Sequence, residues 1–252
     1  MELNNDNYYS NEANWKFMSY SQFKQFCECP AKAMAMLKGE WKEEESESML
    51  IGSYIDSWLD GNIEQFRNEH PSIFNSRTGE LKAGFKQAEQ IIDRMSKDKM
   101  FIDLLTGERQ KILTCNIAGV PFKAKIDSFL DKYTVDGKVL KDCKDVWIDG
   151  ECKSFFWVNR YDVQAAIYKT ARRQNMLGDV PFRLAVVTKE NEPDLRIFEF
   201  SNETIDNALQ EIIAKAPIFQ EMKDGKTEAF RCGCCNYCKN SKILNEDSIE
   251  IL

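Results

Sequence analysis

The stretch PFKAKIDSFLDKYTVDGKVLK, residues 121–141, decides the fold of this chain. It contains two runs rich in β-branched and aromatic residues, 122–130 and 133–140, and only Asp131 and Lys132 lie between them. Two such runs joined by two residues are typical of a tight antiparallel hairpin. The sequence therefore predicts two adjacent strands, paired about a two-residue turn.

Two acids and one lysine fall on one face of this hairpin. The turn places Asp127 opposite Asp136, and strand alternation gives Lys138 the same face as Asp136. Like charges directly opposite each other destabilise a hairpin. A hard divalent cation, which prefers oxygen ligands, offsets that repulsion. The pattern therefore predicts a Mg²⁺ or Mn²⁺ site with an ammonium group beside it.

A helix is predicted downstream, beginning in YDVQAAIYK, residues 161–169. Gln164 and Tyr168 have i, i+4 spacing, so both project from one face of that helix. The run LAVV in residues 181–189 is nearly all apolar and predicts a strand buried on both faces. The order of strand, hairpin, helix, strand, strand and helix indicates a mixed sheet with helices on its faces, in the α/β (α+β) class.

An Asp followed by Asp-x-Lys on adjacent strands resembles the active site of the PD-(D/E)xK nucleases. A Gln-x-x-x-Tyr helix after the Asp-x-Lys strand is similar to the RecB-type branch of that superfamily. Four segments in chain order extend the resemblance to phage and prophage exonucleases related to exodeoxyribonuclease VIII (RecE): NYYS (7–10), KIDSFLD (125–131), YDVQAAIY (161–168) and CGCCNYC (232–238).

The resemblance implies a restriction-endonuclease-like fold and a Mg²⁺- or Mn²⁺-dependent exonuclease. Its implied substrate is the end of duplex DNA, cut from 5′ to 3′ during phage-type recombination beside a single-strand annealing protein. The residues that match the catalytic motifs are Asp127, Asp136, Lys138, Gln164 and Tyr168.

The resemblance also points to a third carboxylate. In related nucleases a glycine in this region is followed four residues later by a histidine that binds metal, whereas this chain has Gly52 and then Asp56. An aspartate supplies oxygen to Mg²⁺ or Mn²⁺ in place of the imidazole. We therefore expect Asp56 to be a metal ligand. His70, the single histidine, is expected in a loop without a catalytic role.

Two other triplets carry an acid and a lysine at i, i+2, namely residues 142–144 and 151–153. The pair Asp136 and Lys138 is favoured because the hairpin places it opposite Asp127 and because VDGK resembles the family's Val-Asp-x-Lys. The alternative pairs, Glu151 with Lys153 and Asp142 with Lys144, stay open at this point. Gly137 departs from the family pattern, which has a larger apolar residue there.

The cysteines predict a second metal site. Cys232, Cys235 and Cys238 form C-x-x-C-x-x-C, three thiolates that one metal ion or cluster can collect. Similarity to iron–sulfur nucleases implies that Cys29 is the fourth ligand, with Cys234 and Cys27 in reserve. A 4Fe–4S cluster is the expected group, and a four-cysteine Zn²⁺ site is the rival. Either would tie the N- and C-terminal segments together.

The N-terminal region is predicted as an extended arm over residues 1–18, followed by a helix that Ser19 opens through a capping box with Gln22. Pro30 is expected to restart that helix. Further helices are expected over residues 81–97 and from residue 202 until Pro217 disturbs the last one. The whole chain, 1–252, is expected to be a single nuclease domain, with an arm and helix in 1–45 and a Cys-rich tail in 226–252.

The composition is that of an ordinary soluble protein of 252 residues, with 43% hydrophobic and 30% charged residues. No apolar run is long enough to span a membrane and the start does not resemble a signal peptide, so a cytoplasmic protein with no membrane partner is expected. Nine cysteines in that compartment are thiols or metal ligands. Self-association into an oligomer is compatible with this composition.

The net charge of −7 argues mildly against nonspecific binding of duplex DNA, which needs clustered Lys and Arg. Together with Gly137 and the missing histidine, it motivates an alternative function. In that alternative, the chain is a nuclease-fold module that binds DNA or a protein without cleaving DNA.

Overall fold

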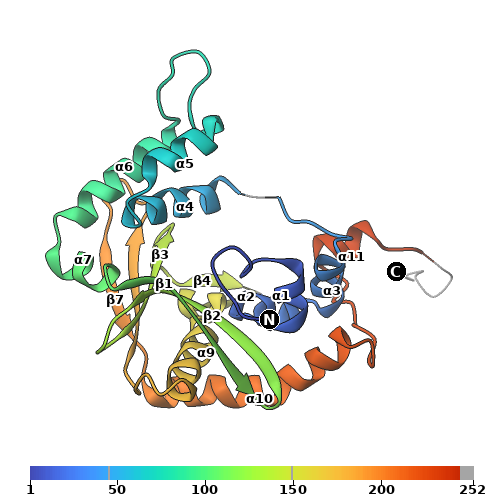
Figure 1. The fold of residues 1–252 in the computed structure, drawn as a ribbon. Coiled ribbons are helices and arrows are strands. Elements are labelled where there is room, and N and C mark those ends of the chain that lie inside the picture. Colours follow the sequence, from blue (N-terminus) through green and yellow to red (C-terminus); the bar gives the residue numbers. More distant parts are fainter. Residues whose placement is uncertain (45, 149, 245–252) are drawn as a thin grey trace. The chain divides into compact units, whose positions relative to one another are not determined.

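The structure is a computed structural model that describes residues 1–44, 46–148 and 150–244 (Figure 1). The chain forms two compact units, each assembled from separate stretches of sequence. Unit 1 comprises residues 1–43, 116–123 and 210–252, and unit 2 comprises residues 44–115 and 124–209. The expectation of a single nuclease domain stays a prediction. The last part of the expected Cys-rich tail, 245–252, lies outside the described residues.

The helices and strands follow one another in the order shown by the labels of Figure 1. The helices are α1 (Asn11–Lys16), α2 (Tyr20–Glu28), α3 (Pro30–Lys38), α4 (Glu47–Leu59), α5 (Ile63–Glu69), the 3-10 helix η1 (Pro71–Ile73), α6 (Ala83–Ser96), α7 (Lys99–Leu105), α8 (Phe155–Asn159), α9 (Tyr161–Gln174), α10 (Asn202–Lys223) and α11 (Asn236–Asn240). The strands are β1 (Glu108–Ile117), β2 (Val120–Phe129), β3 (Thr134–Leu140), β4 (Val146–Ile148), β5 (Glu151–Lys153), β6 (Phe182–Thr188) and β7 (Leu195–Glu199).

Five strands form one mixed sheet in the order β1-β2-β3-β6-β7. The β2–β3 pair is antiparallel, β3–β6 is parallel and β6–β7 is antiparallel. Phe129 pairs with Thr134 and Ser128 with Val135, which is the register that the two-residue turn predicts. The mixed sheet and the register of the hairpin are therefore confirmed. Strands β4 and β5 form a separate two-stranded sheet.

In unit 2, helices cover both faces of strands β3 and β6. On one face, α4, α6 and α7 share a buried core with alternate residues of the strands, including Val135, Ala185 and Val187. The residues between them, such as Asp136 and Leu184, point to the opposite face of the sheet, because side chains alternate along a strand. That face carries α9, as Figure 1 shows. Polar side chains of α9 therefore face β3, the strand that carries Asp136.

Unit 1 has its own aromatic core. Phe23 and Phe26 of α2 pack on Phe219 of α10, with ring centroids 5.5 and 5.1 Å away, and Phe122 is fully buried beside Phe23. Such aromatic pairs contribute to stability beyond the area that they bury. This core fixes α2, whose C-cap residue, Cys29, is also the N-cap of α3.

The N-terminal segment follows the sequence in part. Ser19 caps α2 by accepting a hydrogen bond from the amide of Gln22, and Pro30 is the first residue of α3, as expected. The Gln22 side chain does not complete the capping box, because its Nε2 donates to the carbonyl of Asn14 over 3.0 Å. The extended arm predicted for residues 1–18 is wrong in one place, because α1 forms within it. Ser10 caps that helix by accepting from the amide of Ala13. A helix of 6 residues is too short to show a recognisable period.

The expected break at Pro217 is also wrong, because α10 continues through it to Lys223. Proline removes one backbone donor from a helix and strains the preceding turn. Here the buried side chains of Ala216, Phe219 and Met222, on both sides of the proline, hold the helix in place. Across residues 1–44, 46–148 and 150–244, every helix is too short or too polar to cross a bilayer.

Candidate functional site

The acids of the hairpin lie together, as the register requires. The amide of Gly137 donates to Asp127 Oδ2 over 3.0 Å, so the carboxylate of β2 reaches across to β3. Asp136 is 1% exposed and forms an ion pair with Lys138, two residues further along the same strand. The predicted group of two acids and one lysine is thus assembled within unit 2.

Helix α9 presents Gln164 and Tyr168 to this group. Gln164 Nε2 donates to Asp136 Oδ1 over 2.6 Å and to the hydroxyl of Tyr168 over 3.1 Å. The Tyr168 hydroxyl in turn donates to the carbonyl of Lys125 on β2 over 2.8 Å. The chain of hydrogen bonds therefore fixes the helix to both strands of the hairpin and orients the Asp136 carboxylate.

Tyr161 lies on the same face of α9 as Gln164 and Tyr168, and the sequence did not predict its role. The Nζ of Lys138 lies 5.8 Å from the centroid of the Tyr161 ring, within the range of a cation–π contact. Tyr161 is 4% exposed, so it covers the lysine from the side of α9. Its spacing to Gln164 and Tyr168, i, i+3 and i+7, is one helical face and could have revealed it.

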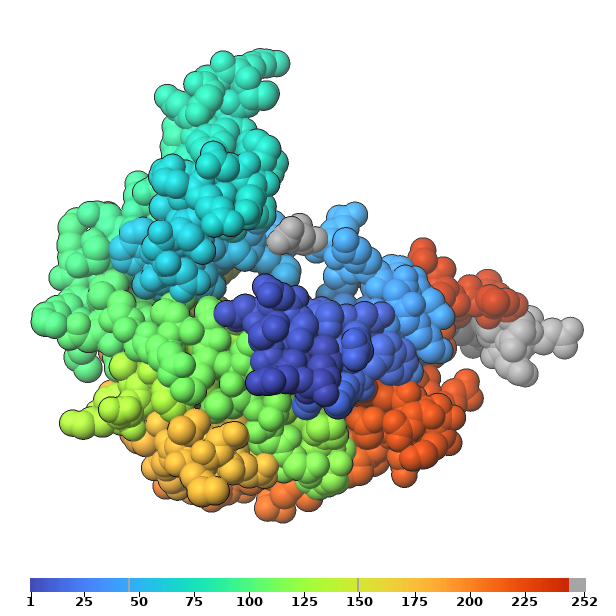
Figure 2. Space-filling model, viewed as in Figure 1, coloured from blue at the N-terminus to red at the C-terminus, as the bar shows by residue number. Residues whose placement is uncertain are grey.

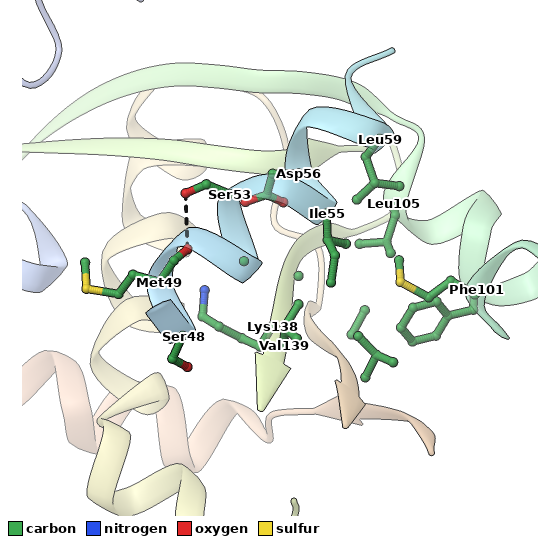
Figure 3. A pocket seen from close by; sticks show the side chains of 15 residues that line it. Ser48, Met49, Ser53, Ile55, Asp56, Leu59, Phe101, Leu105, Lys138 and Val139 are labelled. Carbon is green, nitrogen blue, oxygen red and sulfur yellow. Dashed lines mark hydrogen bonds between the residues drawn. The ribbon is translucent and has the colours of Figure 1, made fainter. Parts of the chain in front are cut away.

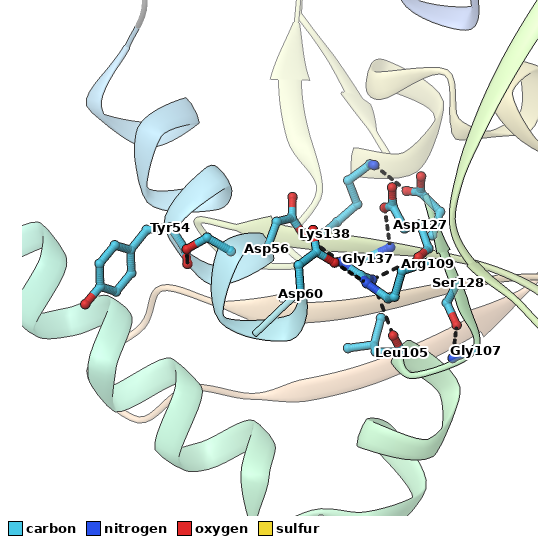
Figure 4. Close-up of polar contacts among 12 residues, drawn as sticks. Tyr54, Asp56, Asp60, Leu105, Gly107, Arg109, Asp127, Ser128, Gly137 and Lys138 are labelled. Carbon is cyan, nitrogen blue, oxygen red and sulfur yellow. Dashed lines mark hydrogen bonds and ion pairs between the residues drawn. The ribbon is translucent and has the colours of Figure 1, made fainter. Parts of the chain in front are cut away.

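Helix α4 and strand β1 add two more acids and an arginine (Figure 4). Arg109 donates through Nε to Asp60 Oδ1 over 2.7 Å, and its Nη2 lies 3.9 Å from Asp56 Oδ1. The same guanidinium donates through Nη1 to the carbonyl of Asp127 over 2.9 Å. Arg109 therefore joins the C-terminal turn of α4 to the strand that carries Asp127. Arg109 and Asp60 were not expected from the sequence.

The charges of the site shift one another's pKa. Burial raises the pKa of Asp136 to about 7, and the carboxylate of Asp127 adds to the rise while Lys138 opposes it. Burial and the Asp127 charge also raise the pKa of Asp56, against Arg109 and Lys138. Burial alone would lower the pKa of Lys138, but Asp136 and Asp127 reverse the effect and raise it. Lys138 is therefore positively charged at neutral pH.

The rival acid–lysine pairs lie elsewhere. Glu151 and Lys153 form an ion pair of 3.1 Å on the β4–β5 hairpin, where the Glu151 side chain is 73% exposed. Asp142 accepts from the amide of Lys144 over 3.0 Å in an exposed turn. Of the three candidates, Asp136 is the acid that receives the hydrogen bond from Gln164.

His70 follows the last residue of α5 and lies in a loop, as the sequence predicts. Its ring stacks on Phe66 with centroids 4.1 Å apart, and its Nδ1 lies 3.0 Å from the Phe66 carbonyl. The segment 61–82, teal in the space-filling view, projects from the rest of unit 2 (Figure 2). The contacts of His70 are accounted for by packing.

The four predicted thiols gather in unit 1. The Sγ atoms of Cys29, Cys232, Cys235 and Cys238 all lie within 4.8 Å of one another. Cys29 Sγ is 3.6 Å from Cys238 Sγ, and Cys232 Sγ is 3.9 Å from Cys238 Sγ. A group of four thiols that could hold a metal or a cluster therefore links the start of α3 to the end of the described chain.

Backbone amides prepare one of these thiols to be a ligand. Hydrogen bonds from the amides of Cys235 and Cys234 lower the pKa of Cys232 to about 6. The amide of Cys235 lies 3.4 Å from Cys232 Sγ. A thiolate is the form that binds metal. Cys234, one of the two reserve ligands, is exposed, and its Sγ is 3.7 Å from Cys232 Sγ. Cys27, the other reserve, is not among the four gathered thiols.

Comparison with known proteins agrees with this geometry. The chain belongs to the family described as a PDDEXK-like domain of unknown function (DUF3799), whose model matches residues 19–241. It is similar to a crystal structure from Eubacterium rectale described as a "Putative exonuclease", with 37% sequence identity and a TM-score of 0.90. The match covers 98% of this chain and 96% of that chain. Among curated proteins, none matches significantly.

Proposed function

We propose that this protein is a metal-dependent deoxyribonuclease that hydrolyses phosphodiester bonds at the ends of duplex DNA. The observation that carries the proposal is the ion pair between the buried Asp136 and the partly buried Lys138, in which Gln164 holds the acid from α9. Asp127 and Asp56 bring two further carboxylates toward this pair. Membership of a PDDEXK-like family and likeness to a structure described as a "Putative exonuclease" support the same assignment.

Asp127, Asp136 and Asp56 would hold one or two Mg²⁺ or Mn²⁺ ions. Their chemistry fits such an ion, because hard cations take carboxylate oxygens. Asp127 also raises the pKa of both other acids, and this repulsion is what a bound cation would offset. When bound, the ion supplies an activated water and neutralises charge that develops on the phosphate.

The protein's own side chains have separate roles in the proposal. Because its neighbouring carboxylates raise the pKa of Lys138, this lysine would act as a fixed positive charge on the scissile phosphate rather than as a base. Gln164 would hold Asp136 in position, and Tyr168 would hold Gln164 through its hydroxyl. Tyr161 would shield the ammonium from water on the α9 side.

Cleavage from 5′ to 3′ and action beside a single-strand annealing protein in phage-type recombination are the finer parts of the proposal. They rest on the resemblance of the motifs to the exonucleases related to exodeoxyribonuclease VIII. Release of labelled nucleotides from duplexes labelled at one 5′ or one 3′ end measures the polarity directly.

The test of the main proposal is nucleotide release from linear duplex DNA in the presence of Mg²⁺ or Mn²⁺. We expect the wild type to release nucleotides from linear DNA and to leave closed circular DNA intact. The Asp127→Ala variant should lose this activity. Persistent cleavage in that variant, from a preparation free of other nucleases, would overturn the assignment of the site.

The alternative, a nuclease-fold module without cleavage, was motivated partly by Gly137. A Cβ atom at this position would lie 3.3 Å from Leu105 Cδ2 and 3.9 Å from Asp127 Oδ2. A glycine therefore suits the tight approach of β3 to α7 and leaves the acids in place. Packing therefore accounts for Gly137, and this residue is no argument for the non-cleaving module.

For the thiol cluster we propose a single tetrahedral ion, Zn²⁺, in preference to an iron–sulfur cluster. Zn–S bonds of about 2.3 Å at tetrahedral angles place the sulfur atoms about 3.8 Å apart. The distances from Cys238 Sγ to Cys29 Sγ and Cys232 Sγ are 3.6 and 3.9 Å. In a cluster each thiolate binds a different iron, which requires wider separations. A closed four-thiolate site leaves no open position for water, so its role would be structural.

Metal analysis of protein purified without exposure to air tests this assignment. We expect about one zinc per chain and no visible absorption. The Cys232→Ser variant should lose the zinc, whereas Cys234→Ser, a matched change at the neighbouring exposed thiol, should retain it. Iron and sulfide in stoichiometric amounts with broad visible absorption would contradict a zinc site.

A further inference from the structure

A cavity of about 380 Å³ lies within unit 2, between α4 on one side and β3, β6 and α7 on the other (Figure 3). Its deeper part is apolar and is formed by Ile55, Leu59, Phe101, Leu105 and Val139. Its polar boundary carries the side chains of Ser48, Ser53, Asp56 and Lys138. An apolar pocket of this size with a few polar groups is typical of a site for a small organic molecule.

The cavity shares two side chains with the proposed active site. Asp56 and Lys138 both line it, and Lys138 also forms the ion pair with Asp136. A phosphate held between the acids and Lys138 would therefore lie at the boundary of the cavity. The group next to that phosphate along a DNA strand is a sugar with its base.

A glycine in α4 leaves the cavity open. Gly52 lines it, and a Cβ atom built at Gly52 would meet nothing within 4 Å. Glycine is less favourable than alanine in a helix interior. A larger side chain at position 52 of α4 would therefore occupy space that is free in the cavity. Met49, one turn earlier and 63% exposed, also lines it.

We propose that this cavity binds the base and sugar of the terminal deoxynucleotide while its phosphate is cleaved. The inference rests on the proposed function and names the part of the substrate that the site selects. A base has apolar faces for the apolar interior. The Ser48 hydroxyl, which accepts from Lys189 Nζ, can still donate to the polar edge of a base, and the Ser53 hydroxyl, which donates to the Met49 carbonyl, can still accept from it. A base can enter only after it leaves the stack, which is least costly at the end of a duplex. The cavity would thereby favour DNA ends over internal positions.

Binding of a mononucleotide tests the cavity without any requirement for cleavage. The probes are thymidine 5′-monophosphate and inorganic phosphate, each titrated into the full-length protein with Mg²⁺ in a calorimeter. We expect the wild type to bind the nucleotide at least about tenfold more tightly than phosphate, because the base and sugar bury apolar surface. Equal affinities for the two probes would overturn the proposal.

Two variants at one position sharpen the test. Gly52→Phe should reduce nucleotide affinity about tenfold or more and leave phosphate affinity unchanged, since the ring occupies the cavity. Gly52→Ala, whose methyl group meets nothing within 4 Å, is the matched smaller change and should weaken nucleotide binding less than Gly52→Phe does. Unchanged nucleotide affinity in a folded Gly52→Phe protein would overturn the proposal.

A second measurement covers the case in which Gly52→Phe fails to fold. Wild-type protein is irradiated with 5-iodo-2′-deoxyuridine 5′-monophosphate, and the labelled peptide is mapped. We expect the label in the peptides that contain α4 or α7, which form the cavity. A label confined to other peptides would contradict the proposal. If the wild type binds nucleotide in this way but releases none from DNA, the proposed function fails while the cavity assignment stands.

Discussion

Lys138 in unit 2 is partly buried and Lys123 in unit 1 is fully buried, and their surroundings act on the ammonium group in opposite directions. Lys138 has the carboxylates of Asp136 and Asp127 beside it, and they raise its pKa. Lys123 is 1% exposed and donates to uncharged oxygens, the carbonyl of Tyr8 and the Oδ1 of Asn14. Burial lowers the pKa of Lys123 to about 8.

A second lysine of unit 1 behaves as Lys123 does. Lys223 is 6% exposed and donates to the carbonyl of Asn14 over 2.9 Å and to Gln22 Oε1 over 3.0 Å. Burial, with a contribution from the Lys123 charge, lowers its pKa to about 8. The comparison teaches that burial alone favours the neutral amine, and that neighbouring carboxylates are needed to preserve a buried positive charge. In unit 2, the lysine with neighbouring carboxylates lies at the proposed catalytic site. In unit 1, the two buried lysines donate hydrogen bonds to the N-terminal segment.

The largest expected effect comes from removing the central carboxylate. The Asp136→Asn variant keeps the shape of the side chain but loses the charge that faces Lys138 and the proposed metal ion. We expect nuclease activity to fall on the order of a thousandfold or more. Release of fluorescent nucleotides from a labelled duplex measures it.

The rival acid provides the control for this prediction. Glu151→Gln, a matched loss of one carboxylate in the other acid–lysine pair, should retain activity close to wild type. A greater loss in Glu151→Gln than in Asp136→Asn would transfer the assignment to the β4–β5 hairpin.

The next effect comes from removing the charged lysine itself. The Lys138→Met variant nearly keeps the length of the side chain. The scissile phosphate of the substrate would lose its positively charged partner, and Asp136 would lose its ion pair. We expect activity to fall on the order of a hundredfold. Lys153→Met should have little effect, because Lys153 is paired with an exposed acid on another hairpin. Equal activity of Lys138→Met and wild type would show that the ammonium group is dispensable.

The lysines of unit 1 predict a pH dependence of stability. Between about pH 8 and about pH 10 the unfolded chain keeps the proton on Lys123, whose ordinary pKa is 10.5, while the folded chain releases it. The unfolded state then binds more protons, so the free energy of unfolding contributed by this group increases as the pH rises. Below about pH 8 both states are protonated and the cost of burying the charge is fully present.

The comparison of wild type with Lys123→Met isolates that contribution. Urea unfolding at several values between about pH 7 and about pH 10 should show a steeper increase of stability in the wild type than in the variant. Lys242→Met, in the exposed C-terminal segment, is the control and should keep the wild-type slope. Identical slopes for wild type and Lys123→Met would mean that burial does not depress the pKa of Lys123.

The smallest expected effect concerns the arginine that joins α4 to β2. Asp60→Asn removes the charged partner of Arg109 but leaves Asp56, Asp127 and Asp136 unchanged. We expect a loss of activity of a few fold, with a shift toward higher metal requirement, because Asp56 is less firmly placed. Titration of activity with Mn²⁺ measures the shift. If the Asp60→Asn variant requires the same Mn²⁺ concentration as the wild type, then the Asp60–Arg109 pair does not position Asp56.

The sequence predicted those parts of the site that depend on short-range spacing. A two-residue turn sets the register of Asp127, Asp136 and Lys138, and helical spacing puts Gln164 and Tyr168 on one face. The C-x-x-C-x-x-C run likewise identified three of the four gathered thiols. Cys29 came from resemblance alone, and the structure places it with them.

Other features depend on packing between distant segments, which a local pattern does not encode. Arg109 meets Asp60 from a strand far along the chain, and the cavity beside Gly52 exists only once α4 covers the sheet. Helix α1 was missed because a single turn and a half shows no period. The sequence predicted too short a helix at α10, because proline disfavours a helix interior and the burial of residues on both sides of Pro217 is not visible in a local pattern.

The position of Cys29 has a consequence for the unfolded protein. Cys29 and Cys238 are separated by 209 residues along the chain, yet their sulfur atoms are 3.6 Å apart. A shared ion that survived unfolding would turn most of the polypeptide into one large ring. The entropy lost on closing a ring grows with its length, so this staple would restrict the denatured ensemble more than a short one. Cys29 is the single ligand that the N-terminal segment supplies, so oxidation of this one thiol would open the ring.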